Sequence, residues 1–372
     1  MVLLAGPRQV GKTTLARHLL GERGGTYFSW DRASDRKQAL ASAWPAAGGL
    51  VVLDELHKYR HWKRWLKGEY DTRPPGLSFL VTGSARMDVF RRGGDSLQGR
   101  YHHWRLHPFT VGELAGVPAS IAQKPGEPIV IPGGDRADLV EALLRFSGFP
   151  EPLVAGSERV WRRWQKERVE RFFLEDVREL ESLRELGGIQ ALADLLPARV
   201  GSPLSANSLR EDLDASHKAV SHWLDVLERL YFAFRIRPHA TRTQRGLRKM
   251  PKLYLWDPTL VDDAGPRFEN LVALHLLRLC HLLEDRDGHR VELCYLRDAD
   301  GREVDFLVTS RGKPWFAVEA KLADQSPSPE FLTYRERLAI PQCFLVTRGG
   351  ARDVVRDGVR CLPAGSFLAA LP

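Results

Sequence analysis

A glycine-rich segment near the start of the chain has the spacing of a phosphate-binding loop. Residues 6–14 fit the pattern G-x-x-x-x-G-K-[ST] between a short apolar run and an amphipathic segment. Backbone N–H groups in such a loop, with the start of the helix that follows, attract phosphate oxygens. Lys12 would then contact the β- and γ-phosphates, and Thr13 would bind Mg²⁺. The candidate nucleotide-binding residues are Gly6, Pro7, Arg8, Gln9, Val10, Gly11, Lys12, Thr13 and Thr14.

Two adjacent carboxylates follow a second apolar run. Asp54 and Glu55 come directly after residues 50–53. Parallel strands present their C-terminal ends to a bound ligand, so Asp54 could reach the Mg²⁺ and Glu55 could polarise an attacking water. The alternative is a strand that simply ends in an acidic turn, but the loop upstream favours nucleotide hydrolysis.

Two further residues could assist hydrolysis. Ser84 follows the apolar run 77–82 and could sense the γ-phosphate, or it could belong to an ordinary turn. Arg100 could serve as an arginine finger on a neighbouring subunit of a homo-oligomer, or it could be a surface arginine.

The last quarter of the chain carries a second set of ionisable residues. Asp305 lies in a predicted strand over 302–308, and Glu319 and Lys321 share one face of another over 315–321. Glu269 lies near the start of a predicted helix. This set resembles the PD-(D/E)xK nuclease signature.

That chemistry would be metal-dependent cleavage of a phosphodiester. Asp305 and Glu319 would bind Mg²⁺, Glu269 would complete the metal shell, and Lys321 would position the attacking water. The alternative is an inactive domain of the same fold, with Glu319 and Lys321 forming an ion pair.

These groups need several domains to position them. The length of 372 residues is too great for one ordinary domain, and short apolar runs alternate with helical patterns up to about residue 115. This alternation predicts a parallel sheet covered by helices. We expect an α/β P-loop domain over residues 1–135, a helical connector over 136–200, a winged-helix-like domain over 201–257 and a second α/β domain over 258–372.

The winged-helix interpretation rests on two predicted helices and a basic segment. Residues 205–213 and 217–229 have helical patterns, and Ser216 could cap the second helix. Two predicted strands follow, and the segment Arg235–Lys252 holds seven basic residues and no acidic one. Such a segment could contact a DNA backbone. It could equally be a solvated loop on a module that only packs between domains.

The motifs together resemble the AAA+ ATPases of the archaeal and bacterial ATPase group, whose C-terminal domain resembles restriction endonucleases. The resemblance covers nearly the whole chain and implies a protein that binds and hydrolyses ATP with Mg²⁺. Relatives generally have a longer segment before the first strand. The residues that carry the resemblance are Gly6–Thr14, Leu53–Glu55, Val81–Ser84, Leu97–Arg100, His107–Phe109, Glu113 and Gly148–Glu151.

Composition adds limits on location and partners. The net charge is 55 − 47 = +8, and no apolar run approaches the length of about 18 to 20 residues that a membrane helix needs. We therefore expect a cytoplasmic protein, with its four cysteines reduced and buried.

The leading hypothesis is an ATPase with a DNA-binding, nuclease-like C-terminal domain. The alternative is an ATP-dependent switch whose C-terminal domain is inactive and binds a partner.

Overall fold

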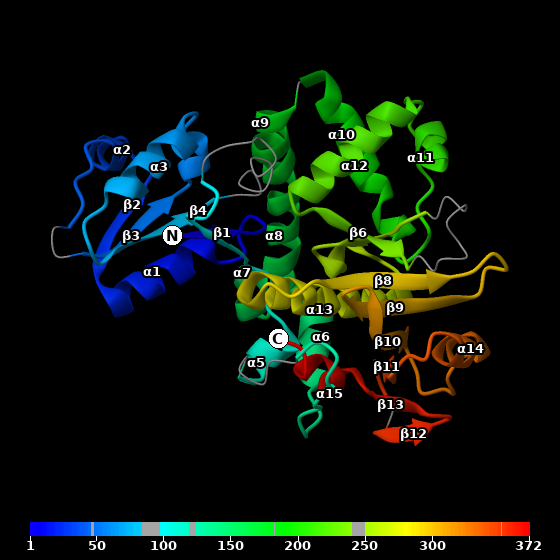
Figure 1. Cartoon of the computed structure of the whole chain (residues 1–372). Coiled ribbons are helices and arrows are strands. Elements are labelled where there is room, and N and C mark those ends of the chain that lie inside the picture. The colour runs from blue at the N-terminus through cyan, green and yellow to red at the C-terminus, as the bar shows by residue number, and fades with distance from the viewer. Residues whose placement is uncertain (46–47, 84–96, 119–123, 182, 240–249, 351) are drawn as a thin grey trace. The chain divides into compact units, whose positions relative to one another are not determined.

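The computed structural model describes residues 1–45, 48–83, 97–118, 124–181, 183–239, 250–350 and 352–372. They form two compact units (Figure 1). The first comprises residues 1–107 with 229–231, and the second comprises residues 108–228 with 232–372.

The first unit is built on a parallel sheet of five strands in the order β2-β3-β4-β1-β5. This confirms the α/β class and the parallel sheet predicted for the N-terminal part. The strands are β1 (Val2–Ala5), β2 (Gly25–Ser29), β3 (Gly49–Asp54), β4 (Leu77–Thr82) and β5 (His102–Arg105).

Helices cover both faces of this sheet because the strands bury apolar side chains on both sides. Helix α1 (Lys12–Arg23) packs on the face that holds Leu4, Val52 and Leu80. Helix α3 (Trp62–Thr72) packs on the opposite face. Helix α2 (Ala33–Leu40) and a 3-10 turn (Leu56–Lys58) complete the described helical segments of the unit.

The second unit begins with a series of helices. The bounds of the first five are α5 (Val111–Leu114), α6 (Ala137–Phe146), α7 (Pro150–Ala155), α8 (Glu158–Arg171) and a π-helical segment (Phe172–Val177). The next are α9 (Arg178–Leu180), α10 (Leu183–Leu195), a 3-10 turn (Pro197–Arg199), α11 (Ala206–Asp212) and α12 (His217–Arg229). The helical pattern predicted over 161–186 is interrupted after Leu180, where Glu181 has an extended backbone.

Helix α12 has the bounds and the buried face that the sequence predicts. The Ser216 hydroxyl accepts a hydrogen bond from the Ala219 N–H, at 3.1 Å, and so caps the helix. Val220, Trp223, Leu224 and Leu227 are all buried. The pair α11 and α12 is therefore a helix–turn–helix in the general sense of two short helices joined by a tight turn.

The rest of the unit is a mixed sheet of eight strands in the order β12-β13-β11-β10-β9-β8-β6-β7. The strands are β6 (Ala233–Pro238), β7 (Lys252–Leu255), β8 (Val291–Arg297), β9 (Glu303–Ser310), β10 (Lys313–Lys321), β11 (Gln342–Thr347), β12 (Val354–Arg356) and β13 (Val359–Pro363). The accompanying helical segments are a 3-10 turn (Pro258–Leu260), α13 (Ala264–Asp287), α14 (Pro329–Arg337) and α15 (Ala364–Ala369).

Strands β6 and β7 belong to this large sheet. The sequence pattern instead predicts that they end a winged-helix-like domain at residue 257. Strand β6 pairs with β7 on one side and lies parallel to β8 on the other. All four residues of β7 are buried. A free-standing wing would expose one face of such a strand, so the apolar character of β6 and β7 is explained by their place in the sheet.

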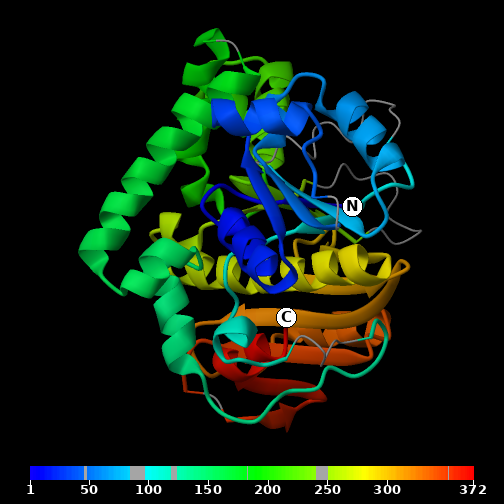
Figure 2. The same ribbon diagram turned by 90° about the vertical axis from the view of Figure 1, so that its left-hand side faces the viewer.

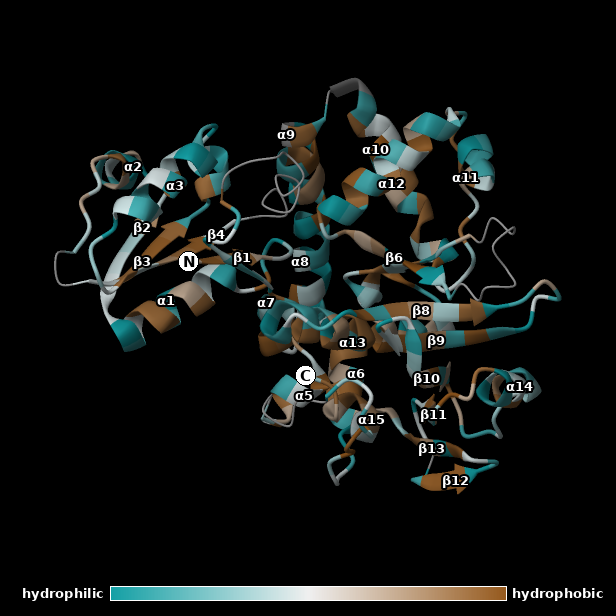
Figure 3. Cartoon of the chain, viewed as in Figure 1, coloured by the Kyte–Doolittle hydropathy of each residue, from teal (hydrophilic) through white to brown (hydrophobic). Residues whose placement is uncertain are grey.

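Two helices enclose the sheet. Helix α13 runs across one face and contacts β7, β8, β9 and β10 (Figure 2). The buried residues of this helix lie between Phe268 and Leu283, and the part of the helix visible in Figure 3 is mostly brown. Helix α14 packs on the other face through Phe331 and Tyr334. None of the helices in the described residues is long and apolar enough to cross a membrane.

Candidate functional site

The phosphate-binding loop joins β1 to α1, as its pattern predicts. Gly6 has φ 148°, and a Cβ atom at that position would lie 2.4 Å from the Leu106 carbonyl oxygen. Only glycine therefore fits there. Gly11, directly before the helix, has φ 100° and gives the loop its final turn.

Lys12 is folded back into the loop. Its side chain is buried, and its ammonium donates to the carbonyl oxygens of Gly6 at 3.0 Å and Pro7 at 2.7 Å. The ammonium thus lies over the concave side of the loop, where the pattern requires it to meet phosphate oxygens.

Asp54 lies at the C-terminal end of β3 and gathers three hydroxyl groups. The Thr13 hydroxyl donates to Asp54 Oδ2 at 3.0 Å, and the Tyr27 hydroxyl donates to the same oxygen at 2.5 Å. The Thr82 hydroxyl donates to the other oxygen, Oδ1. The sequence predicted the meeting of Thr13 and Asp54, but it did not single out Tyr27 or Thr82.

Tyr27 and Thr82 reach Asp54 from opposite sides because their strands, β2 and β4, flank β3 in the sheet. Burial and the neighbouring Asp54 carboxylate raise the pKa of Tyr27 to about 12, so the phenol stays protonated and keeps donating. Tyr27 belongs to no motif, and Thr82 lies in the Val81–Ser84 landmark without a role assigned to it. Only the strand order shows that both reach Asp54.

The hydroxyl of Thr13 and the carboxylate of Asp54 fit a magnesium ion. Both are hard oxygen ligands, which Mg²⁺ prefers, and it is usually bound by one or two protein groups together with phosphate oxygens and water. Their separation of 3.0 Å brings the two oxygens to one point at the mouth of the loop. A bound Mg²⁺ would neutralise charge on the transferred phosphoryl group.

Glu55 follows Asp54 in a left-handed backbone conformation, with φ 59°. Its Oε2 atom lies 3.6 Å from His57 Nε2 and 3.8 Å from Lys58 Nζ. Burial raises the pKa of Glu55, while Lys58 and Lys12 oppose the increase. A carboxylate with a raised pKa is a better proton acceptor, which suits the polarisation of water.

Of the two residues that were expected to assist hydrolysis, Ser84 and Arg100, the structure describes only Arg100. Ser84 lies outside the described residues. Arg100 makes two hydrogen bonds to Asp71 of the same chain, from Nε at 2.7 Å and from a terminal nitrogen at 3.1 Å. The arginine-finger role would require Arg100 to leave Asp71, and it remains a prediction.

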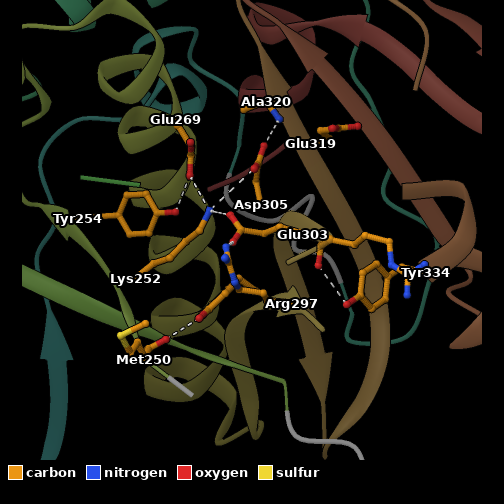
Figure 4. A network of polar contacts seen from close by, with 12 residues as sticks. Met250, Lys252, Tyr254, Glu269, Arg297, Glu303, Asp305, Glu319, Ala320 and Tyr334 are labelled. Atoms are coloured by element: carbon orange, nitrogen blue, oxygen red, sulfur yellow. Dashed lines mark hydrogen bonds and ion pairs between the residues drawn. The ribbon is translucent and has the colours of Figure 1, made fainter. Parts of the chain in front are cut away.

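Two of the predicted C-terminal residues, Glu269 and Asp305, lie with Glu303 around a lysine that the sequence places only among the basic residues of 235–252. Lys252, the first residue of β7, has its ammonium 2.6 Å from Glu303 Oε1, 3.3 Å from Glu269 Oε1 and 3.9 Å from Asp305 Oδ1 (Figure 4). Its side chain is only 1% exposed. The cluster is thus centred on a buried cation.

Glu319 and Lys321 form an ion pair with each other, at 3.1 Å. Glu319 also accepts a hydrogen bond from the Ser328 N–H at 3.4 Å. The backbone N–H of Ala320, which lies between them, donates to Asp305 Oδ2 at 2.9 Å. Strands β9 and β10 therefore bring Asp305 next to the Glu319–Lys321 segment, while Glu269 joins it from α13.

The charges shift the titration of these groups. Burial and the Asp305 carboxylate raise the pKa of Glu269 above its ordinary value. Burial alone would lower the pKa of Lys252, but the carboxylates of Glu269, Asp305 and Glu303 outweigh burial and raise it. Lys252 therefore stays charged.

A magnesium ion does not fit this arrangement. Within the described ranges, no three His, Cys, Asp or Glu side chains are grouped so as to hold a metal ion. The ammonium of Lys252 stands where the three carboxylates converge. The metal roles predicted for Glu269, Asp305 and Glu319 gain no support from this geometry and remain predictions.

Part of the basic segment 235–252 is engaged within the chain. Arg235 pairs with Asp225 at 2.7 Å and with Glu228 at 2.6 Å, and Lys252 is buried in the carboxylate cluster. Residues 240–249 lie outside the described residues. The positive charges of Arg235 and Lys252 are therefore already paired within the chain, so fewer basic residues of this segment could contact DNA than the sequence suggests.

Family models match three consecutive parts of the chain. Residues 1–115 match a model described as an AAA domain, in agreement with the resemblance above. Residues 137–265 and 264–367 match two domains of unknown function, DUF8612 and DUF4143.

Several proteins are similar over almost the whole chain. An uncharacterized protein of Mycobacterium tuberculosis is 24% identical, with 99% of this chain and 81% of that protein covered. An uncharacterized protein of Methanocaldococcus jannaschii is 25% identical, with 99% and 84% covered. Among solved structures, the Aeropyrum pernix ORC1 protein in complex with DNA has 17% identity and a TM-score of 0.31, over 73% of this chain and 86% of that chain.

Proposed function

We propose that this protein binds ATP with Mg²⁺ at the loop of residues 6–14 and hydrolyses it. The observation that carries the proposal is the hydrogen bond of 3.0 Å between Thr13 and Asp54, because it brings a loop hydroxyl and a strand-end carboxylate to one point. Lys12 supplies a positive charge to the phosphates, and Glu55 polarises the attacking water. These are the parts that phosphoryl transfer to water requires.

The test is ATP hydrolysis by purified wild-type protein and two variants. Glu55→Gln should lower the turnover by at least about 100-fold while ATP still binds, since it removes only the proton acceptor. Lys12→Ala should abolish ATP binding. Lys37→Ala and Glu22→Gln change exposed residues of the same unit and serve as matched controls. Full hydrolysis by Glu55→Gln would overturn the role given to that residue.

For the C-terminal domain, two functions follow from different observations. The first is Mg²⁺-dependent cleavage of DNA by Asp305, Glu319, Glu269 and Lys321, supported by the adjacency of Asp305 to the Glu319–Lys321 segment. The second is binding of a partner by an inactive domain, so that the protein acts as an ATP-dependent switch. The buried ammonium of Lys252 favours the second.

Nicking of supercoiled plasmid and cleavage of single-stranded DNA, each with Mg²⁺ or Mn²⁺, separate the two functions. Cleavage that disappears in Asp305→Ala and Glu319→Ala would establish a nuclease. The second function predicts no cleavage with either metal. In parallel, DNA affinity measured at two salt concentrations should fall with salt if the basic segment contacts phosphates.

A further inference from the structure

The carboxylate cluster of the C-terminal domain, defined here as Glu269, Glu303 and Asp305, contains its own cation. Lys252 Nζ lies within 4 Å of one oxygen of each of the three side chains. These residues come from three elements, β7, α13 and β9. The Ala320 N–H of β10 contacts Asp305 as well. The ammonium is therefore held from several directions by the fold.

Several of the carboxylate oxygens also have donors other than the ammonium. The Tyr254 hydroxyl donates to Glu269 Oε1, the oxygen that also faces the ammonium, at 2.7 Å, and an Arg297 nitrogen donates to Glu303 Oε2 at 2.6 Å. Asp305 Oδ2 accepts from the Ala320 N–H at 2.9 Å. A divalent ion that bound here would have to displace these donors as well as the ammonium.

A lysine and a divalent ion exclude each other in such a place. Mg²⁺ requires oxygen ligands at about 2.1 Å in near-octahedral geometry. The oxygens that would supply them face the ammonium, and two cations close together in a buried site repel strongly. The side chain of Lys252 is only 1% exposed, so its ammonium is surrounded by protein groups.

We propose that Lys252 is the resident cation of the carboxylate cluster, so that the C-terminal domain of the wild-type protein binds no divalent metal there. The proposal deepens the second of the two functions above and rests on it, because it gives the physical reason for an inactive domain. It also implies that the three carboxylates, which surround the ammonium and are not grouped for a metal, would close on a divalent ion once the ammonium is removed.

The experiment measures Mn²⁺ bound to the full-length protein without nucleotide, by the paramagnetic resonance signal of the free ion. The samples are wild type, Glu269→Gln, Lys252→Met and the double variant. Methionine keeps an unbranched apolar side chain and removes the charge. We expect wild type and Glu269→Gln to bind the same amount of Mn²⁺. Lys252→Met should bind one further ion, and the double variant should lose it.

Two results would overturn the proposal. One is a wild-type Mn²⁺ ion that Glu269→Gln loses. The other is a folded Lys252→Met protein that gains no ion. If Lys252→Met is unfolded without metal, the proposal requires Mn²⁺ to restore its native circular dichroism, and failure to do so counts against it.

Measuring ATP hydrolysis by the same wild-type sample distinguishes a failure of the proposed ATPase function from a failure of the proposal for Lys252. A wild-type protein that hydrolyses no ATP would defeat the function proposed for the AAA domain without affecting the Mn²⁺ result. Mn²⁺-dependent cleavage lost in Glu269→Gln would defeat both the second function and the role of Lys252.

Discussion

Asp54 is held by more hydroxyl groups than a metal-binding carboxylate needs. If Mg²⁺ binds as proposed, the Thr13 hydroxyl would turn to the ion, while Tyr27 and Thr82 would remain on the carboxylate. Each lies on a strand beside β3 and so fixes the carboxylate relative to the sheet. We interpret both as positioning residues, which act on the ion through Asp54.

Tyr27→Phe tests this interpretation by removing one hydroxyl. A hydrogen bond to a charged group contributes about 1.5–3 kcal/mol, so the Mg²⁺ concentration for half-maximal ATP hydrolysis should rise about tenfold, with part of the loss offset by Thr82. Hydrolysis measured over a Mg²⁺ titration provides the check. Tyr59→Phe removes a hydroxyl elsewhere in the same unit and should leave the titration unchanged.

The contact between Thr13 and Asp54 could be predicted because each residue lies in a motif of its own, although the two are 41 residues apart. Tyr27 and Lys252 were missed because no motif marks them, even though their partners are only 27 and 17 residues away. Such contacts depend on which strands and helices become neighbours, and no local pattern encodes that.

At the scale of elements, helices α10 and α12 pack through a glycine. A Cβ atom at Gly188 would lie 2.3 Å from the Trp223 ring. The indole N–H of Trp223 also donates to Glu185, one turn before Gly188. Two positions of α10 therefore contact the ring, and α10 can approach it this closely only because residue 188 has no side chain.

Gly188→Ala should lower the free energy of unfolding by roughly 1–3 kcal/mol through overpacking, despite the higher helix propensity of alanine. Gly187→Ala is the matched control. A Cβ at that neighbouring position meets nothing within 4 Å, so this variant should be neutral or more stable by up to about 1 kcal/mol. Chemical denaturation of the two proteins provides the comparison, and equal effects would refute the packing argument.

Helix boundaries and strand existence were largely predictable at this scale, whereas strand neighbours were not. The apolar stripe of α12 and its Ser216 cap gave both ends of that helix. Strands β6 and β7 were also expected, but their alternation of apolar and polar residues does not indicate which sheet they join. Their sheet is determined by the pairing of β6 with β8, for example between Arg237 and Cys294, which lie far apart in the sequence.

At the scale of the whole molecule, a buried histidine connects distant parts of the second unit. His275 of α13 accepts a hydrogen bond from the Val111 N–H through Nε2 at 3.0 Å, and its Nδ1 lies 2.8 Å from the Leu271 carbonyl oxygen. It is therefore neutral and protonated on Nδ1. Nearby, Arg278 of the same helix pairs with Glu113 of α5.

The second unit should consequently lose stability in mild acid. Burial lowers the pKa of His275 from 6.5 to about 4, so the unfolded chain binds the proton more tightly than the folded one. Stability is full above pH 6.5 and falls as the pH drops towards 4, by roughly 3 kcal/mol for this shift. Thermal unfolding of wild type and His275→Gln at pH 7 and pH 4.5 should show a smaller pH effect in the variant.

The shared sheet of the second unit has a consequence for how this protein can change over evolutionary time. The two families of unknown function meet at residues 264 and 265, yet β6 and β7 lie before that point and β8 to β13 after it. A recombination event at the family boundary would unite strands from different ancestors in one sheet and would part Lys252 from the carboxylates it neutralises. The two segments are therefore expected to be inherited together, as a single heritable unit.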